Sequence, residues 1–510
     1  MEIFKNAAVL LKLRNPDRVT EVIPKSKKVG DKVVVNWGVD EARVLKNLDI
    51  NVPSPILGQY KWSGNVTPYS HQKATSSFLT LHQKAFCFNE QGTGKTASAI
   101  WAADYLLNKG VISRVLVVCP LSIMDSAWRS DLFTFAMHRT VDVAHGSRNK
   151  RKEIIAQGSE FVIINYDGVE TVLDDLIAGG FDLVIVDEAT HYKNAQTKRW
   201  KTLNKLVGPD VWVWMMTGTP AAQSPLDAYG LAKMVNPNGV PRFFGSFRDQ
   251  VMVKVTQFKW IPKDTATETV FDALQPAIRF TKEECLDLPD MVYVNRKVEL
   301  TRQQSTYYKQ LKDKFILQAA GEDVTAANAA VNMNKLLQIS AGAIYTDTGE
   351  VLEFDIKHRY KVLMEVIEES SKKVLVFVPF RHAISLLHEK LTADGVPAEV
   401  INGAVNARKR TDIFNRFQTS EDPRVLLIQP QAAAHGVTLT AANTIVWWGP
   451  TASLETYAQA NARVHRAGQD HKCTVVKLQG SPVESRVYAL LDNRIDVHSK
   501  IIDLYKDLLD

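Results

Sequence analysis

The sequence predicts an α/β protein made of two parallel-sheet lobes with helical insertions, preceded by a small N-terminal accessory domain. The first observation is a series of apolar, β-branched runs that alternate with helical patterns, at residues 115–119, 161–165, 183–186 and 211–216. The second is the return of this alternation after residue 357, at 373–378, 425–428, 444–447 and 474–477. Continuous apolar strands of this kind belong to parallel sheets that helices cover on both faces.

The regions around the two lobes set the expected domain boundaries. Short strand-like runs, followed by a stretch rich in proline and glycine, predict an accessory domain and linker over residues 1–60. Residues 225–345 have mainly helical patterns. We therefore expect the first lobe over 61–295 and the second over 296–510, each with a helical insertion.

Composition narrows the class of protein. With 510 residues, 45% hydrophobic and 23% charged, the chain fits two to four globular domains and not a disordered or fibrous protein. No apolar run reaches the ~18 residues of a membrane span, and the N-terminus lacks the pattern of a signal peptide, so we expect a cytoplasmic protein. The net charge of +6 favours polyanionic partners. The four cysteines are too few and too dispersed for a disulfide framework or a zinc site: Cys87, Cys119, Cys285 and Cys473.

A glycine-rich loop between a strand and a helix predicts a phosphate site. The segment Gly92-Thr93-Gly94-Lys95-Thr96 follows a strand-like run and precedes a helical one. Glycines let backbone N–H groups turn towards phosphates, and the N-terminus of a helix favours anions. Lys95 would reach the β and γ phosphates of ATP, and the Thr96 hydroxyl would bind Mg²⁺. Asn89 stands where the usual pattern has its first glycine.

An acidic pair at the end of a buried strand predicts the second part of this site. The run 181–186 ends in Asp187-Glu188, and ligands of parallel sheets bind beyond the carboxyl ends of the strands. Asp187 would hold Mg²⁺, and Glu188 would orient and deprotonate the attacking water. An isolated Asp-Glu pair would be read as a helix cap, but the nearby phosphate loop favours catalysis.

Gln72 is a candidate for contact with adenine. It precedes the phosphate loop by about two helical turns and a strand. A glutamine amide can pair with both hydrogen-bonding edges of adenine. An exposed surface glutamine is the alternative, and the position beside the other motifs favours adenine.

Two arginines near the end of the second lobe predict the groups that stabilise phosphoryl transfer. Arg463 and Arg466 are three residues apart, so on a helix they would share a face. Arginine fingers place positive charge on the departing γ-phosphate and accelerate transfer by roughly 10³–10⁵. With the phosphate loop on the first lobe, hydrolysis would require both lobes.

Together these motifs resemble the SNF2 (Swi2/Snf2) family of superfamily 2 helicase-like ATPases, in the compact form typical of bacteria or viruses. The resemblance covers residues 68 to about 500 and implies two RecA-like lobes that use ATP. Further segments similar to the family's motifs are Val115 to Ser122 with Trp128, Lys193-Asn194, Thr217 to Pro220, Leu274-Gln275-Pro276 with Arg279 and Lys282, Leu288-Pro289, Gly436 to Ala442, and His465 to Gln469.

The resemblance also implies roles for residues outside the phosphate loop. Gly436 would contact the nucleotide, and the residues that would couple ATP to nucleic-acid contacts are His191, Thr217, Gly218, Thr219 and Gln459. Two positions depart from the family. Thr190 stands where a histidine is usual, with His191 one residue later, and His435 replaces a common glycine. Neither belongs to the phosphate loop, so we expect ATPase activity to be retained.

Contacts to DNA are indicated by basic residues and by the resemblance. Two basic clusters could face phosphates, although charge runs also occur on solvated faces: Arg148, Lys150, Arg151 and Lys152, and Arg408, Lys409 and Arg410. In the family, Pro120, Ser122 and the region of Asn165 would line the DNA groove. Such contacts grip the backbone, so binding should be sensitive to salt and independent of base sequence.

We therefore expect a DNA-stimulated ATPase that translocates, as a monomer, on duplex or branched DNA during replication, recombination or repair. A strand-separating helicase acting on branched DNA or RNA is one alternative. A nucleic-acid-binding scaffold with a catalytically weak motor is another. Residues 1–60 would either recognise a DNA structure or support the first lobe.

Overall fold

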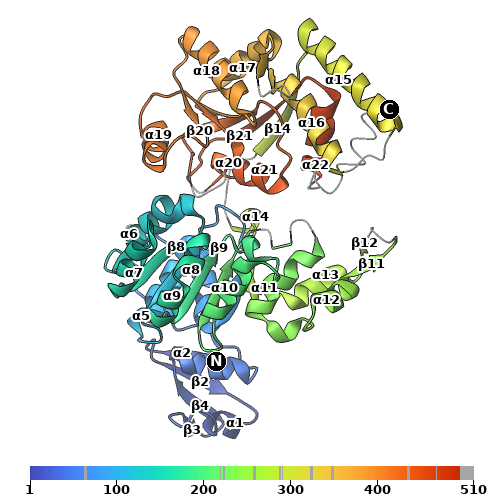
Figure 1. Cartoon of the computed structure of the whole chain (residues 1–510). Coiled ribbons are helices and arrows are strands. Elements are labelled where there is room, and N and C mark those ends of the chain that lie inside the picture. Colours follow the sequence, from blue (N-terminus) through green and yellow to red (C-terminus); the bar gives the residue numbers. More distant parts are fainter. Residues whose placement is uncertain are drawn as a thin grey trace. The chain divides into compact units, whose positions relative to one another are not determined.

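The computed structural model describes residues 1–62, 66–218, 220–221, 224–256, 260–285, 289, 291–321, 326–345, 350–433, 437–466 and 468–493. The chain divides into two units, Met1–Leu286 and Asp287–Asp510. The division comes earlier than the expected boundary after residue 295, because strand β14 (Met291–Lys297) pairs along its length with a strand of the second unit's sheet. Both units contain a parallel sheet with helices, as predicted (Figure 1).

The sheet of the first unit has seven parallel strands in the order β13-β5-β10-β9-β6-β8-β7. Their bounds are β5 (Lys84–Cys87), β6 (Val115–Cys119), β7 (Val141–Val143), β8 (Phe161–Asn165), β9 (Leu183–Asp187), β10 (Trp212–Met216) and β13 (Ala277–Ile278). Leu116 and Val118 pack into one hydrophobic core, and Val115 and Val117 into another. The sheet is therefore covered on both faces, which explains why its strands are continuous apolar runs.

Helices connect these strands and cover the sheet. They are α3 (Ile56–Gln59), α4 (Ser70–Leu81), α5 (Lys95–Asn108), α6 (Ser130–Phe135), α7 (Arg148–Ala156), α8 (Tyr166–Thr171), α9 (Leu173–Ala178), α10 (Lys198–Leu206) and α11 (Ala228–Val235). Helix α5 is the most buried, because ten consecutive residues from Ala97 to Leu106 are inaccessible. Among the described residues, no helix is both long and apolar enough to cross a membrane.

The segment 225–345 is mainly helical as predicted, with α11, α12 (Phe244–Val251), α13 (Ala266–Ala273), α14 (Lys282–Cys285), α15 (Arg302–Gly321) and α16 (Ala326–Ala341). It also contains strands that the helical interpretation missed: β11 (Met252–Lys254), β12 (Trp260–Pro262), β13, β14 and β15 (Ala343–Tyr345). These strands are short or lie at a sheet edge. β14 begins with a short apolar run at residues 291–294 but continues into polar residues, and none of its residues is fully buried.

The second unit has a six-stranded parallel sheet in the order β14-β21-β20-β17-β19-β18. The strands other than β14 are β17 (Lys373–Phe377), β18 (Ala398–Ile401), β19 (Val425–Ile428), β20 (Ala442–Trp447) and β21 (Cys473–Gln479). Helices α17 (Lys357–Glu369), α18 (Arg381–Ala393), α19 (Ala407–Thr419), α20 (Pro430–Ala433), α21 (Leu454–Asn461) and α22 (Pro482–Asp492) accompany them. Leu375 and Phe377 face one core, and Val374 and Val376 the other.

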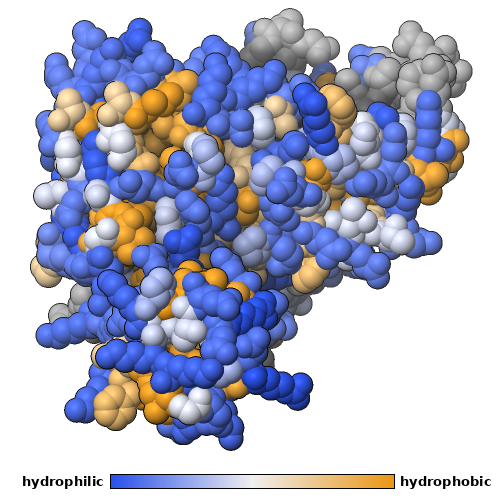
Figure 2. All heavy atoms as spheres, turned by 90° about the horizontal axis from the view of Figure 1, so that it is seen from below, coloured by the Kyte–Doolittle hydropathy of each residue, from blue (hydrophilic) through white to orange (hydrophobic). Residues whose placement is uncertain are grey.

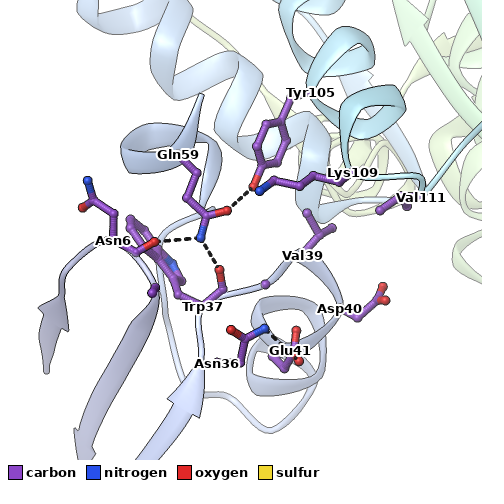
Figure 3. A pocket seen from close by; sticks show the side chains of 12 residues that line it. Asn6, Asn36, Trp37, Val39, Asp40, Glu41, Gln59, Tyr105, Lys109 and Val111 are labelled. Carbon is purple, nitrogen blue, oxygen red and sulfur yellow. Dashed lines mark hydrogen bonds between the residues drawn. The ribbon is translucent and has the colours of Figure 1, made fainter. Parts of the chain in front are cut away.

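The N-terminal region forms an antiparallel sheet, and Figure 1 shows it with two helices against the rest of the first unit. The strands are β1 (Glu2–Phe4), β2 (Ala8–Lys12), β3 (Lys27–Val29) and β4 (Lys32–Asn36), and the helices are α1 (Asp17–Thr20) and α2 (Val39–Asn47). The Gln59 amide joins this domain to the lobe. It donates to Asn6 O (2.9 Å) and Trp37 O (2.6 Å) and accepts from the Tyr105 hydroxyl (3.1 Å). These contacts border a cavity of about 410 Å³ (Figure 3).

Candidate nucleotide site

The predicted phosphate loop joins β5 to α5. Gly92 (φ 90°) and Gly94 (φ 81°) lie in the left-handed region, which glycine adopts readily. Gly94 is the N-cap of α5, so the first backbone N–H groups of a buried helix begin at Lys95. Lys95 Nζ donates to the carbonyls of Asn89 (2.9 Å) and Glu90 (3.3 Å). The loop thus presents a helix N-terminus and an ammonium group beside one another, a suitable combination for an anion.

Asn89 departs from the usual pattern because its side chain supports the loop. It is fully buried, its Nδ2 donates to Thr75 Oγ1 (2.8 Å), and its Oδ1 accepts from Phe280 N (3.0 Å). The segment around β13 continues this contact, since Glu90 N donates to Phe280 O (2.9 Å). Asn89 therefore ties the loop to α4 and to the strand at the sheet edge, a role that no sequence pattern signals.

Gln72 and His71 hold the loop from α4. Gln72 Oε1 accepts from Tyr69 N (3.0 Å), and its Nε2 donates to Thr93 O (3.3 Å). His71, which the sequence analysis did not single out, donates from Nε2 to the same carbonyl (2.8 Å) and is only 4% exposed. A Cβ at Gly94 would lie 2.1 Å from Gln72 Nε2. Gln72 thus contacts the phosphate loop, and its contact with adenine remains a prediction.

Asp187 and Glu188 end β9 at the same edge of the sheet as the phosphate loop. Asp187 pairs in register with Met216, which pairs with Cys87, so only β10 separates the acidic pair from the strand before the loop. Trp128 Nε1 donates to Asp187 Oδ2 (2.9 Å). Glu188 has φ 48°, which is uncommon for a residue with a side chain. Such conformations occur often at functional sites.

Tyr166 supports the backbone of the acidic pair. Its hydroxyl donates to Asp187 O (2.7 Å). Burial, together with the neighbouring Asp187 and Glu188 carboxylates, raises the pKa of Tyr166 well above its ordinary value. The hydroxyl therefore stays protonated and remains a hydrogen-bond donor at any physiological pH.

Thr96 and Asp187 suit a magnesium ion. A hydroxyl and a carboxylate are oxygen ligands, which Mg²⁺ prefers, and Mg²⁺ usually keeps several waters and takes further ligands from substrate phosphates. The structure places Thr96 in the first turn of α5 and Asp187 at the end of β9, both at the loop edge of the sheet. In the described part of the chain, no group of three or more His, Cys, Asp or Glu side chains could hold a metal alone. A metal here would rely on phosphate and water.

Arg463 and Arg466 converge, but not on a helix. Helix α21 ends at Asn461, and both arginines lie in the turns that follow. The expectation that they share a helical face is therefore wrong. Instead, Nη1 of Arg463 (3.5 Å) and Nη1 of Arg466 (3.1 Å) both donate to Val437 O, and Arg466 also donates to Thr438 Oγ1 (3.1 Å). The two side chains meet at the segment that resembles motif V.

Comparison with known proteins identifies the family. Residues 32–343 match the SNF2-related domain, and residues 358–468 match the helicase conserved C-terminal domain. The chain belongs to the SNF2-related family. Mycoplasma relatives of this chain are named ATP-dependent helicases. The predicted resemblance is confirmed.

Individual relatives are distant and longer. An uncharacterized ATP-dependent helicase of Mycoplasma genitalium is 24% identical over 81% of this chain and 40% of its own length. The mouse chromodomain-helicase-DNA-binding protein 1-like is 26% identical over 89% of this chain and 52% of its own length. The chain thus spans about half the length of these relatives or less. The solved Sulfolobus solfataricus SWI2/SNF2 ATPase core in complex with dsDNA is 21% identical, with 87% of this chain and 96% of that chain covered and a TM-score of 0.43.

The predicted coupling residues have different environments. The His191 ring lies 4.8 Å from that of Tyr166, and burial and the nearby Arg199 lower its pKa. Thr217 is buried, and its N–H donates to Cys87 O (3.1 Å), just before the phosphate loop. Gln459 Nε2 donates to Glu455 Oε1 (3.0 Å) within α21. Gly218 directly follows Thr217, whereas Thr219 and Gly436 lie outside the described residues.

In the basic cluster on α7, not every cation is available to bind phosphates. Arg151 is only 8% exposed and donates to Ala144 O (2.8 Å) and Asn165 Oδ1 (2.9 Å), so neither Arg151 nor that oxygen faces solvent freely. Lys152 pairs with Asp175 (3.3 Å). The expectation for Arg151 is therefore wrong. Burial lowers its pKa, but the guanidinium remains charged and links α7 to β8.

The other candidate DNA contacts differ in exposure. Arg408 and Lys409 are exposed in the first turn of α19, whereas Arg410 turns back and donates to Val405 O (3.1 Å). Pro120 is buried at the end of β6, and Ser122 is exposed in the short helix that follows. Of the predicted basic residues on α19, Arg408 and Lys409 remain available to a polyanion.

Proposed function

We propose that this chain is a DNA-stimulated ATPase that translocates along double-stranded DNA. The observation that supports it most strongly is the position of the phosphate loop and of Asp187-Glu188 at one edge of one parallel sheet, in a chain of the SNF2-related family. Polyanion binding has weaker support, from the exposed Arg408 and Lys409 and from the DNA-binding named for the mouse relative.

In this proposal, residues of the first unit bind the nucleotide and activate the attacking water. The backbone N–H groups at the start of α5 and the Lys95 ammonium would hold the phosphates, and on ATP binding Lys95 would exchange its two carbonyl partners for phosphate oxygens. Mg²⁺, when bound at Thr96 and Asp187, supplies positive charge beside the β and γ phosphates. Glu188 would orient and deprotonate water.

The second unit would supply charge to the departing phosphate. Arg463 and Arg466 are already grouped around one carbonyl, Val437 O, and in this proposal they act as arginine fingers. Each cycle of ATP binding and hydrolysis would then move the motor along a DNA backbone. Because the contacts are to phosphates, binding should weaken steeply with salt and depend little on base sequence.

Glu188→Gln tests the assignment of the base. This variant should bind ATP and duplex DNA as the wild type does, while DNA-stimulated hydrolysis falls by about 10²–10⁴, the usual contribution of a general base. The matched control is Glu170→Gln on α8, which removes one carboxylate that is 43% exposed and pairs at the surface with Lys198. Hydrolysis at the wild-type rate in Glu188→Gln would refute the mechanism.

A separate experiment compares nucleic-acid substrates. ATPase rates of the wild type should rise with duplex DNA, and a triplex-displacement assay should report movement without strand separation. Release of a labelled strand from forked DNA or RNA would favour a strand-separating helicase. Absence of stimulation by any DNA or RNA form would favour a scaffold with a weak motor.

A further inference from the structure

The outer face of the N-terminal sheet is a surface that the motor does not explain. In antiparallel pairs, residues directly opposite each other point to the same face. Val9, Leu11, Val33 and Val35 point inward and form the core with α1 and α2. The alternate residues of the same strands therefore line the opposite face of the sheet, which neither α1 nor α2 covers.

This outer face combines apolar side chains with lysines. The register places the following residues on it: Glu2, Phe4, Ala8, Leu10, Lys12, Lys27, Val29, Lys32, Val34 and Asn36. Phe4 is 63% exposed and Val29 is 61% exposed. Lys5 Nζ lies 5.4 Å from the centre of the Phe4 ring. In the view from below, hydrophobic and hydrophilic side chains are interleaved over the molecular surface (Figure 2).

The segment that contains the four strands has a net positive charge. Residues 1–38 contain eight Lys and Arg against four Asp and Glu, which accounts for +4 of the net charge of +6. Lys12 and Lys32 are directly opposite each other, an arrangement of like charges that destabilises a sheet. Lys12 is 3.4 Å from the exposed Asp31, and such surface pairs contribute little. Lys27 and Lys32 form no ion pair with any residue that the structure describes.

The combination of lysines and apolar side chains on this face favours one kind of polyanion. A DNA duplex presents phosphates but hides the faces of its bases, so the exposed Phe4 and Val29 would gain little from it. A single strand presents phosphates and apolar base faces together, and proteins bind it by combining cationic side chains with stacking aromatic groups. We propose that the outer face of the N-terminal sheet binds single-stranded DNA. The choice of DNA over RNA rests on the function proposed above.

Side-chain contacts connect the domain to the first lobe, which carries the phosphate loop. Beside the Gln59 contacts, the Tyr60 hydroxyl donates to Asp104 Oδ2 on α5 (2.6 Å), and the Arg43 guanidinium lies 4.7 Å from the Trp212 ring. The cavity of Figure 3 lies among these contacts and not on the outer face. The surface would thus be a second DNA contact in the same unit as the proposed ATP site.

Fluorescence anisotropy with the full-length chain tests this surface. The probes are a labelled single-stranded DNA, its duplex and a single-stranded RNA of the same sequence. The variant Lys12→Glu with Lys32→Glu should lose tenfold or more in affinity for the single strand, and the slope of log K against log salt should fall by about 1.4, at about 0.7 per phosphate contact. Phe4→Ala should lose about tenfold through stacking.

Matched controls separate this surface from general electrostatics. Lys201→Glu with Lys205→Glu on α10 makes the same change in net charge at two exposed lysines and should leave single-strand affinity unchanged. All variants should keep the wild-type melting temperature and duplex-stimulated ATPase rate. The proposal is overturned if both double variants lose equal affinity, if duplex affinity falls as much as single-strand affinity, or if only RNA binding changes. Absent DNA-stimulated ATPase in the wild type would instead refute the proposed function.

Discussion

Replacing Gly94 with alanine probes the link between α4 and the phosphate loop. A side chain at φ 81° costs about 1–2 kcal/mol. The new Cβ would also lie 2.1 Å from Gln72 Nε2, so the glutamine must move and lose its hydrogen bonds to Thr93 O and Tyr69 N, at about 1 kcal/mol each. The structure therefore predicts a loss of about 3–4 kcal/mol in the free energy of unfolding.

Gly110→Ala is the matched control for this change. Gly110 follows the end of α5 with φ 66°, and no described atom lies within 4 Å of a Cβ built there. It should cost only the backbone term of about 1–2 kcal/mol and leave ATP binding unchanged. Gly94→Ala should weaken ATP binding at least tenfold, because the displaced Gln72 and the loop it contacts belong to the proposed nucleotide site.

Urea denaturation and binding of a fluorescent ATP analogue measure the two effects. Gln72→Ala removes the clashing atom and the same two hydrogen bonds, so the double variant with Gly94→Ala should be more stable than the sum of the single effects predicts, by about 2 kcal/mol. Equal stability and equal ATP affinity in Gly94→Ala and Gly110→Ala would refute the idea that Gln72 supports the loop.

Two further predictions concern the supports of the first lobe. Burial, opposed by the hydrogen bond to Phe78 O, lowers the pKa of His82 from 6.5 to about 4. The unfolded chain therefore takes up a proton before the folded one, and stability present above pH 6.5 is lost towards pH 4, by about 2 kcal/mol at pH 5. Denaturation at pH 7 and pH 5 should show this loss, and His82→Gln should reduce it; an unchanged pH dependence would contradict the assignment. Asn89→Gly restores the usual loop pattern but should lower stability by about 1–3 kcal/mol and give no gain in ATPase rate, since it removes hydrogen bonds to Thr75 and Phe280. A faster and equally stable variant would argue against the supporting role.

The sequence predicted the central strands well because the burial of such a strand determines the residue types within the strand itself. A strand that is buried on both faces must be apolar throughout, and β6, β8 and β19 have the expected bounds. The edge strand β14 was missed because its apolar run is short and polar residues follow it, and none of its residues is fully buried. Its pairing with β21, far along the chain, decides its conformation, and a sequence window cannot contain that information.

The predictions for the basic residues were partly wrong for a related reason. Arg151 and Lys152 are neighbours in a charged run, yet Arg151 is buried against two backbone carbonyls and Asn165, whereas Lys152 pairs at the surface with Asp175. The direction of each side chain depends on which element packs beside α7. Similarly, Arg463 and Arg466 meet at Val437 through turns and not through helical periodicity. Residue type indicated a cation, but tertiary structure decides what it contacts.

The sequence predicted candidate reactive groups but not the hydrogen bonds that support them, and the order of the sheet explains why. Motifs predict groups that would act on ATP, such as Lys95 and Glu188, because phosphate chemistry restricts residue type. Trp128 is chosen by geometry instead: it follows β6, which lies next to β9, so its indole N–H reaches the Asp187 carboxylate. Residues after adjacent parallel strands meet at one edge. Once strand order is known, such supporting contacts can be sought directly, and without it a buried tryptophan is indistinguishable from core.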